Sequence, residues 1–247
     1  MTPIQQSWPT ASTTAERLAL LSSEGRKAAV RENRDLAALY NIHKTGIWPF
    51  CVAQALVRST HARAAEGWYA AAARFLITGD RADLVPARGY SSSFGADALQ
   101  RALLSFRGLG EFTKIGSLRA YDAAALGAAQ TKSVQFAMKK ELPGLGAWLF
   151  CAPFHLMALL RPSVWEDPRL DGLLLPLGSA LARGYGLLQA AGVADVEESL
   201  LRDTEPGLRN GLTLLYIARG CEEKLAAAAG SRALFLHHGI AELGKAR

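Results

Sequence analysis

Long segments of alanine, leucine and charged residues at helical spacing constrain the fold of this chain more than any other feature. Residues 14–40 show this pattern, and it returns at 49–76, where Pro49 suits the first turn of a helix. The same spacing predicts further helices at 97–106, 121–141, 147–160, 170–191, 196–202, 207–229 and 231–243, with a turn-rich connector at 84–96. Because the sequence lacks a set of alternating β-branched runs, it predicts an all-α fold.

The domain organisation follows from length and composition. The 247 residues, of which 50% are hydrophobic and 20% charged, suit one large domain or two small ones, and neither a repeat of fixed period nor a sharp change of composition divides them. Residues 1–14 are polar and lack periodic apolar positions, so we expect a flexible N-terminal arm. Residues 15–247 are then expected to form a single helical unit.

The longest apolar run, residues 142–160, approaches the length that spans a membrane. Prolines, glycines and a histidine interrupt this run, and the sequence has no second one like it. We therefore expect a buried core helix here and no membrane partner.

Cysteine and histidine usage gives no sign of a metal centre. Cys51, Cys151 and Cys221 form no Cys-x-x-Cys pair, and the adjacent His237 and His238 point to different sides of a helix. The sequence predicts neither a disulfide framework nor a metal or other cofactor, and it favours a reducing cytoplasm. The net charge of +6 mildly favours a polyanionic partner.

The segment 132–160 is expected to form a pair of helices joined by the tight turn Leu142, Pro143, Gly144, Leu145 and Gly146. Two glycines permit close approach of a ligand, and the free N–H groups at the start of the second helix could bind a phosphate. The plainer interpretation is that these residues only end one helix and begin the next. A second Gly-Leu-Gly, at 108–110, shows how common such a pattern is.

The context of this turn resembles the helix-hairpin-helix DNA glycosylase superfamily. Its members carry Leu-Pro-Gly-hydrophobic-Gly between two helices and a required aspartate about twenty residues after the second glycine. Here Asp167 follows Gly146 by 21 positions (167 − 146), after an apolar helix and the connector "RPSVWE". A weaker resemblance covers the helix around 49–76. Together the two regions cover about a third of the chain.

Two departures narrow the resemblance to one branch of the superfamily. Bifunctional members keep a lysine two residues after the second turn glycine, whereas this chain has Trp148 there. The four-cysteine iron–sulfur loop of other branches is also missing. The resemblance therefore implies a monofunctional, 3-methyladenine-glycosylase-like enzyme that removes a base with water and does not cleave the strand.

The catalytic residue that the resemblance implies is Asp167. Cleavage of an N-glycosidic bond builds positive charge on the sugar, which an ionised carboxylate stabilises while it orients or deprotonates the attacking water. Asp167 could instead only cap a helix ahead of Pro168, in which case Asp171 could be the catalytic acid.

The resemblance also implies a DNA partner and a set of DNA contacts. The turn would hold a DNA phosphate, often through a bound monovalent cation in this superfamily, while Lys139, Lys140 and Arg161 add electrostatic attraction. The reacting nucleotide must rotate out of the duplex, and Trp48, Trp148 and Trp165 are candidates to line its pocket, although a core role is the plainer interpretation for each. We expect a monomer with two helical subdomains, one built mainly from the early helices and the C-terminal part and one around the hairpin, with the active cleft between them.

The target base and the pathway stay open at this point, with DNA repair and defence against modified phage DNA as alternatives. Two other classes of function also stay open. One is a nucleoside N-glycosidase acting on a small molecule, and the other is a non-enzymatic helical module that binds DNA or a protein.

Overall fold

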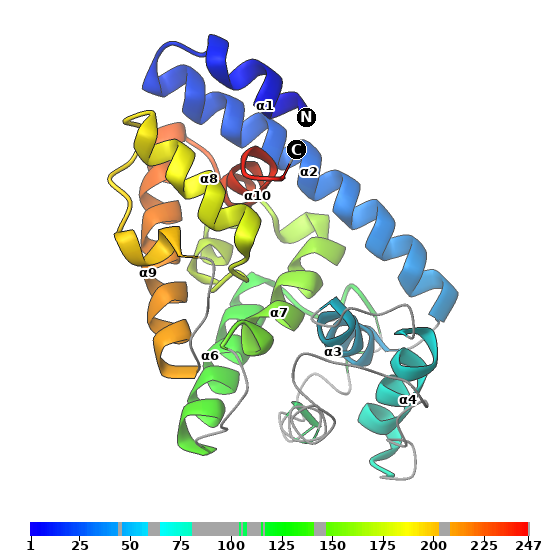
Figure 1. The fold of residues 1–247 in the computed structure, drawn as a ribbon. Helices are drawn as coiled ribbons and strands as arrows, with labels where there is room; N and C mark the ends of the chain where they lie inside the picture. Colours follow the sequence, from blue (N-terminus) through cyan, green and yellow to red (C-terminus); the bar gives the residue numbers. More distant parts are fainter. Residues whose placement is uncertain are drawn as a thin grey trace.

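The structure is a computed structural model that describes residues 1–43, 46–58, 65–80, 104, 106–107, 115, 117–140, 147–202 and 208–246. The described residues form helices and no strand, so the predicted all-α class is confirmed (Figure 1). The α-helices are α1 (Pro3–Ser7), α2 (Thr14–His43), α3 (Ile47–Arg58), α4 (Ala65–Thr78), α6 (Ala123–Lys140), α7 (Trp148–Leu160), α8 (Ser179–Ala190), α9 (Leu208–Ala229) and α10 (Ala233–Leu243). Short 3₁₀ helices are η1 (Trp8–Thr10), η3 (Pro162–Val164), η4 (Pro168–Gly172) and η5 (Glu198–Leu201).

Several predicted helices match closely, and two predictions were wrong in their extent. Helices α2, α6, α7, α9 and α10 begin and end within three residues of the predicted bounds. The predicted helix at 170–191 is instead η4, an extended segment and α8, because Pro176 disfavours helical backbone before it. Residues 49–76 contain two helices, α3 and α4. The predicted connector at 84–96 and most of the predicted helix at 97–106 lie outside the described residues.

The N-terminal segment is not the loose arm that its composition suggests. The side chains of Thr2 and Gln5 form a capping box at the start of α1, where Pro3 fits the first helical position. Ile4 is fully buried, and the Gln5 side chain donates hydrogen bonds to the carbonyl oxygens of Leu243 and Lys245. The two ends of the chain are therefore joined, as Figure 1 shows.

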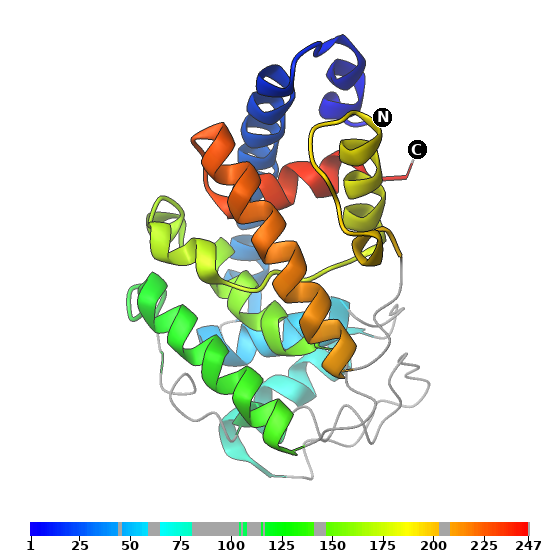
Figure 2. The same ribbon diagram turned by 90° about the vertical axis from the view of Figure 1, so that its left-hand side faces the viewer.

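The apolar side chains gather in two large cores. The first core lies among α3, α4, α6, α7 and the second half of α2, and it includes Trp48 and Phe154. The terminal core lies among α1, α8, α9, α10 and the start of α2, and it includes Ile4 and Tyr185. This division pairs the start of the chain with its C-terminal part (Figure 1). A smaller cluster, in which Leu212 and Leu215 of α9 meet Val134 of α6 and Cys151 of α7, joins the C-terminal part to the predicted hairpin (Figure 2). A cleft between two subdomains stays a prediction.

Helices α2 and α10 tie the two cores together. A Cβ atom on Gly25 would meet the backbone of Phe235, and one on Gly239 would meet the backbone of Leu21. The two glycines thus let the helix backbones touch where they cross. Beside this crossing, buried polar groups pair with each other: Tyr185 donates to the Glu222 carboxylate at 2.7 Å, and His237 Nδ1 lies 2.8 Å from the same oxygen.

Candidate functional site

The two helices of the predicted hairpin, α6 and α7, pack against each other. Residues 141–146, which hold the predicted phosphate-binding turn and its cation site, lie outside the described residues. The side chains of Lys140 and Trp148 do so too. Lys139 is exposed near the end of α6, where a polyanion could reach it. The DNA contacts of the turn therefore stay predictions.

The chain turns sharply between α7 and Asp167, and hydrogen bonds fix this path. Helix α7 ends at Leu160, and Pro162 opens the short helix η3. The indole N–H of Trp165 donates to the carbonyl oxygen of Ala158 at 2.8 Å, and the N–H of Asp167 donates to Val164 at 3.0 Å. Asp167 is thereby set at the start of η4.

Asp167 caps η4, and its carboxylate is bound by Arg169. Its Oδ1 atom accepts hydrogen bonds from Arg169 N at 2.9 Å and Arg169 Nε at 3.0 Å, and its Oδ2 atom accepts one from Nη2 at 2.6 Å. The side-chain hydrogen bond from Arg169, followed by the backbone one, lowers the pKa of the Asp167 carboxyl from 3.8 to about 2. The side chain keeps 22% of its surface exposed. Asp167 is therefore ionised at neutral pH and open to solvent.

Asp171, the second candidate acid, joins η4 to α10. Its Oδ1 atom accepts a hydrogen bond from the N–H of Ala233 at 2.8 Å, the first residue of α10. Its Oδ2 atom pairs with Arg232 at 3.0 Å. Because the α10 N-cap residue makes no side-chain cap of its own, Asp171 supplies that acceptor from outside the helix.

Arg161 lies over an aromatic ring near the same turn. Its guanidinium carbon is 5.1 Å from the centroid of the Tyr121 ring, and its Nε donates to the Ser163 hydroxyl at 3.2 Å. The Tyr121 hydroxyl donates to the carbonyl oxygen of Met157 at 2.6 Å, and burial raises the pKa of Tyr121. Arg161 is thus held in place by stacking and stays partly exposed.

The predicted base-pocket tryptophans that the structure describes lie in the first core. Trp48 is fully buried and its ring contacts Phe106 and Phe154. Trp165 is nearly buried and meets the edge of Phe235. A flipped base would reach either ring only if these contacts opened, which agrees with the plainer interpretation of both residues.

Sequence reasoning missed two residues that shape this region. Arg169 binds Asp167. The sequence signal for this contact was Asp-Pro-Arg, in which the acid and the base are two positions apart and can pair at the start of a short helix. Gln130 on α6 is buried and bonds both backbone groups of Leu174, donating to its oxygen at 2.9 Å and accepting from its nitrogen at 2.7 Å. No local pattern reveals that second link, because it joins residues 44 positions apart.

The part of the chain that the structure describes holds no group of three or more His, Cys, Asp or Glu side chains placed to bind a metal ion. Among the same residues, no helix is both long and apolar enough to cross a membrane. Comparison of the chain with models of protein families, with curated proteins and with solved structures gives no match.

Proposed function

We propose that this chain is a monofunctional DNA N-glycosylase, which flips a damaged or modified base out of the duplex and hydrolyses its N-glycosidic bond. The observation that carries the proposal is the Asp167 carboxylate, which is ionised, partly exposed and set at the start of η4 by the path from α7. Its distance in sequence from the Leu-Pro-Gly-Leu-Gly turn and the all-α class both agree with the resemblance.

The low pKa of Asp167 favours one of its two chemical roles. A carboxylate with a pKa of about 2 is a weak base at neutral pH, so it would take a proton from water poorly. It keeps its full negative charge, however, and would stabilise the positive charge that develops on the deoxyribose and orient the attacking water. Arg169 occupies both oxygens. Bound DNA would therefore have to draw the guanidinium onto a phosphate to free one of them.

The proposed partner is double-stranded DNA, bound by a monomer in the cytoplasm. The turn at 142–146, Lys139, Lys140 and Arg161 would hold the phosphate backbone, in keeping with the net charge of +6. Such contacts position the enzyme without selecting a base. Both DNA repair and defence against modified phage DNA fit this chemistry.

The test is incubation of the protein with duplexes that contain unmodified, alkylated, oxidised, deaminated or phage-modified bases. Released bases are detected by mass spectrometry, and abasic sites by strand cleavage with and without alkali. We expect base release from at least one duplex, with cleavage only after alkali. Asp167→Asn should lower the rate at least about 100-fold and leave DNA binding unchanged.

Asparagine is a suitable replacement because it caps a helix about as well as aspartate, so folding should be preserved. A matched control is Glu16→Gln, since the Glu16 carboxylate also accepts hydrogen bonds from backbone N–H groups, those of Thr13 and Ser12, which lower its pKa. This control should keep full activity. Base release by Asp167→Asn at the wild-type rate would refute the catalytic assignment.

The engagement of Asp167 and Asp171 in helix caps favours a second candidate, a non-enzymatic helical module that binds DNA or a protein. Tight DNA binding without base release from any duplex would support this candidate over the enzyme.

A further inference from the structure

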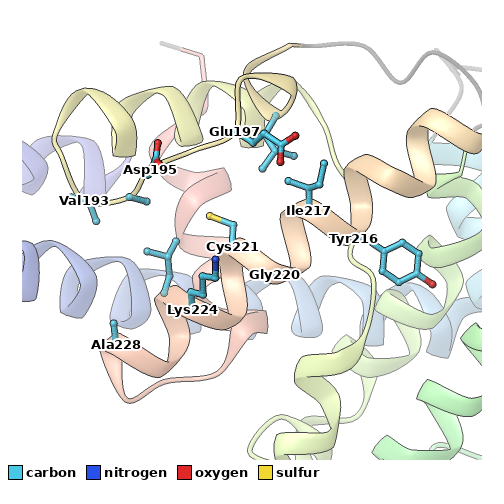
Figure 3. Close-up of a pocket in the computed structure, with 12 residues that line it drawn as sticks. Val193, Asp195, Glu197, Tyr216, Ile217, Gly220, Cys221, Lys224 and Ala228 are labelled. Carbon is cyan, nitrogen blue, oxygen red and sulfur yellow. The ribbon is translucent and has the colours of Figure 1, made fainter.

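A cavity of about 600 Å³ lies between α9 and the segment that joins α8 to η5 (Figure 3). Gly192 ends α8 with a positive φ of 64°, and the chain then runs past α9 as residues 193–197. The residues that α9 contributes to the cavity include three small ones, Gly220, Cys221 and Ala228. A Cβ atom on Gly220 would have nothing within 4 Å, so this wall of the cavity is open.

The floor of the cavity is apolar and its walls are charged. Leu200 and Leu225 are buried at its base. Asp195 and Glu197 lie on the joining segment, and Lys224 lies on α9 (Figure 3). The wall formed by the joining segment is therefore negatively charged and the wall formed by α9 is positively charged, with two carboxylates facing one ammonium group.

These three charged groups make no ion pair or hydrogen bond with any other residue that the structure describes. The sequence of α9 explains this for Lys224, because the residues four positions away on either side are Gly220 and Ala228, which cannot pair with it. Its neighbour along the helix, Glu223, already pairs with Arg219. The charges around the cavity are therefore free to bind a ligand.

The one thiol in the cavity wall is unsuited to covalent chemistry. Burial, followed by the charge of Glu222, raises the pKa of Cys221 to about 11, although Lys224 opposes this. The thiol stays protonated at neutral pH and is a poor nucleophile. The cavity is therefore suited to reversible binding.

We propose that this cavity binds a small zwitterion with an apolar body, of the size of a hydrophobic amino acid or somewhat larger. Its ammonium group would lie against Asp195 and Glu197, its carboxylate against Lys224 and its apolar part on Leu200 and Leu225. The volume lies in the usual range for small-molecule sites, about 300–1,000 Å³. This inference does not depend on the proposed glycosylase activity, since none of these residues belongs to the site around Asp167.

The test compares three probes that share a phenyl body, namely L-phenylalanine, phenethylamine and 3-phenylpropionate. Binding is followed by amide chemical shifts in NMR titrations at millimolar concentrations. We expect phenylalanine to bind best, then the ammonium compound and then the carboxylate, because two acids face one lysine. Shifts should concentrate on residues 193–200 and 216–228. Failure of all three probes to give saturable binding would overturn the proposal.

Substitution of the charged residues tests which of them binds the ammonium group of the ligand and which binds its carboxylate. Glu197→Gln should weaken phenylalanine and phenethylamine about fivefold and leave 3-phenylpropionate unchanged, whereas Lys224→Met should weaken phenylalanine and 3-phenylpropionate. Both side chains are exposed, so folding should be unaffected. Equal effects on all three probes would contradict the proposed orientation.

The third test is a substitution that fills the cavity with a side chain. Gly220→Phe places a ring in the open space and should abolish binding, while Gly220→Ala should retain it. Thermal unfolding of both variants checks the fold. Undiminished binding by a folded Gly220→Phe protein would place the ligand elsewhere and overturn the proposal.

Discussion

Arg169 holds the Asp167 carboxylate in a two-pronged ion pair, with Nη2 2.6 Å from Oδ2 and Nε 3.0 Å from Oδ1. The two residues are separated only by Pro168, whose fixed φ favours the start of η4. Proline thus sets the backbone turn that brings the guanidinium to the carboxylate. The pair explains why the pKa of this partly exposed carboxyl lies below its ordinary value.

The first prediction concerns the titration of Asp167. Its pKa is lowered from 3.8 to about 2, so the protonated form is less favoured in the folded protein than in the unfolded chain. The stabilisation is therefore fully present above about pH 4 and is lost as the pH falls toward 2. We expect carbon-detected NMR of the side-chain carboxyl to give a midpoint near 2 in the native protein.

Arg169→Ala should move that midpoint upward, because it removes the largest cause of the lowered pKa and leaves the backbone hydrogen bond and the weaker attraction of Arg232. A matched control is Arg202→Ala, since Arg202 pairs with Glu198 on the surface and should not affect Asp167. A native midpoint near 3.8 would mean that the ion pair does not persist in solution.

Local patterns in the sequence predicted most of the helices, but they could not predict every boundary. Helical spacing located α2, α6 and α9, because each has an apolar face that must be buried, whereas an apolar run located α7, which is buried on all sides. Helical spacing also wrongly extended one predicted helix through Pro176, whose ring disfavours helical backbone at the residue before it. The short helix at Pro3–Ser7 was missed, since it depends on Ile4 entering the terminal core beside the far end of the chain.

The candidate site was predictable only as far as its residues are close in sequence. The cap formed by Asp167 was foreseen as an alternative because Asp before Pro is a common helix start. The bond from Asp171 to α10 joins residues 62 positions apart and gives no local signal. The burial of Trp48 and Trp165 likewise depends on tertiary packing, since an aromatic residue suits a core as well as a pocket.

A second prediction tests the crossing of α2 and α10. Gly239→Ala puts a methyl group into the backbone of Leu21, which no side-chain rotation can relieve, so we expect a loss of about 3 kcal/mol in the free energy of unfolding. Gly127→Ala, in α6, is the matched control because its Cβ would have nothing within 4 Å. It should stabilise the protein by about 0.4–1 kcal/mol. Urea unfolding measures both changes, and equal effects would show that the helices do not touch as described.

A third prediction concerns the buried Glu222, whose carboxylate accepts from Tyr185 and lies beside His237. Glu222→Leu leaves two buried polar groups without their partner and should cost about 3 kcal/mol or more. Tyr185→Phe removes one donor and should cost about 1 kcal/mol.

The control is Glu223→Leu, one position along α9, whose ion pair is on the surface. That change should stay within about 0.5 kcal/mol. A similar loss for both glutamate variants, measured by urea unfolding, would argue against the buried network.

The last prediction separates Asp167 from Asp171 as the catalytic acid. Asp171 caps α10 and pairs with Arg232, so Asp171→Ala should destabilise the protein by about 1–2 kcal/mol. Asp171→Asn keeps an oxygen for the N–H of Ala233 and should lose less stability than Asp171→Ala.

If Asp167 is the catalytic acid, Asp171→Asn retains base release and Asp167→Asn does not, although both fold. Thermal unfolding and base release are measured on the same preparations, so a folding defect cannot be mistaken for lost chemistry. The reverse result, activity in Asp167→Asn and none in a folded Asp171→Asn protein, would transfer the catalytic role to Asp171 and leave Asp167 as a helix cap.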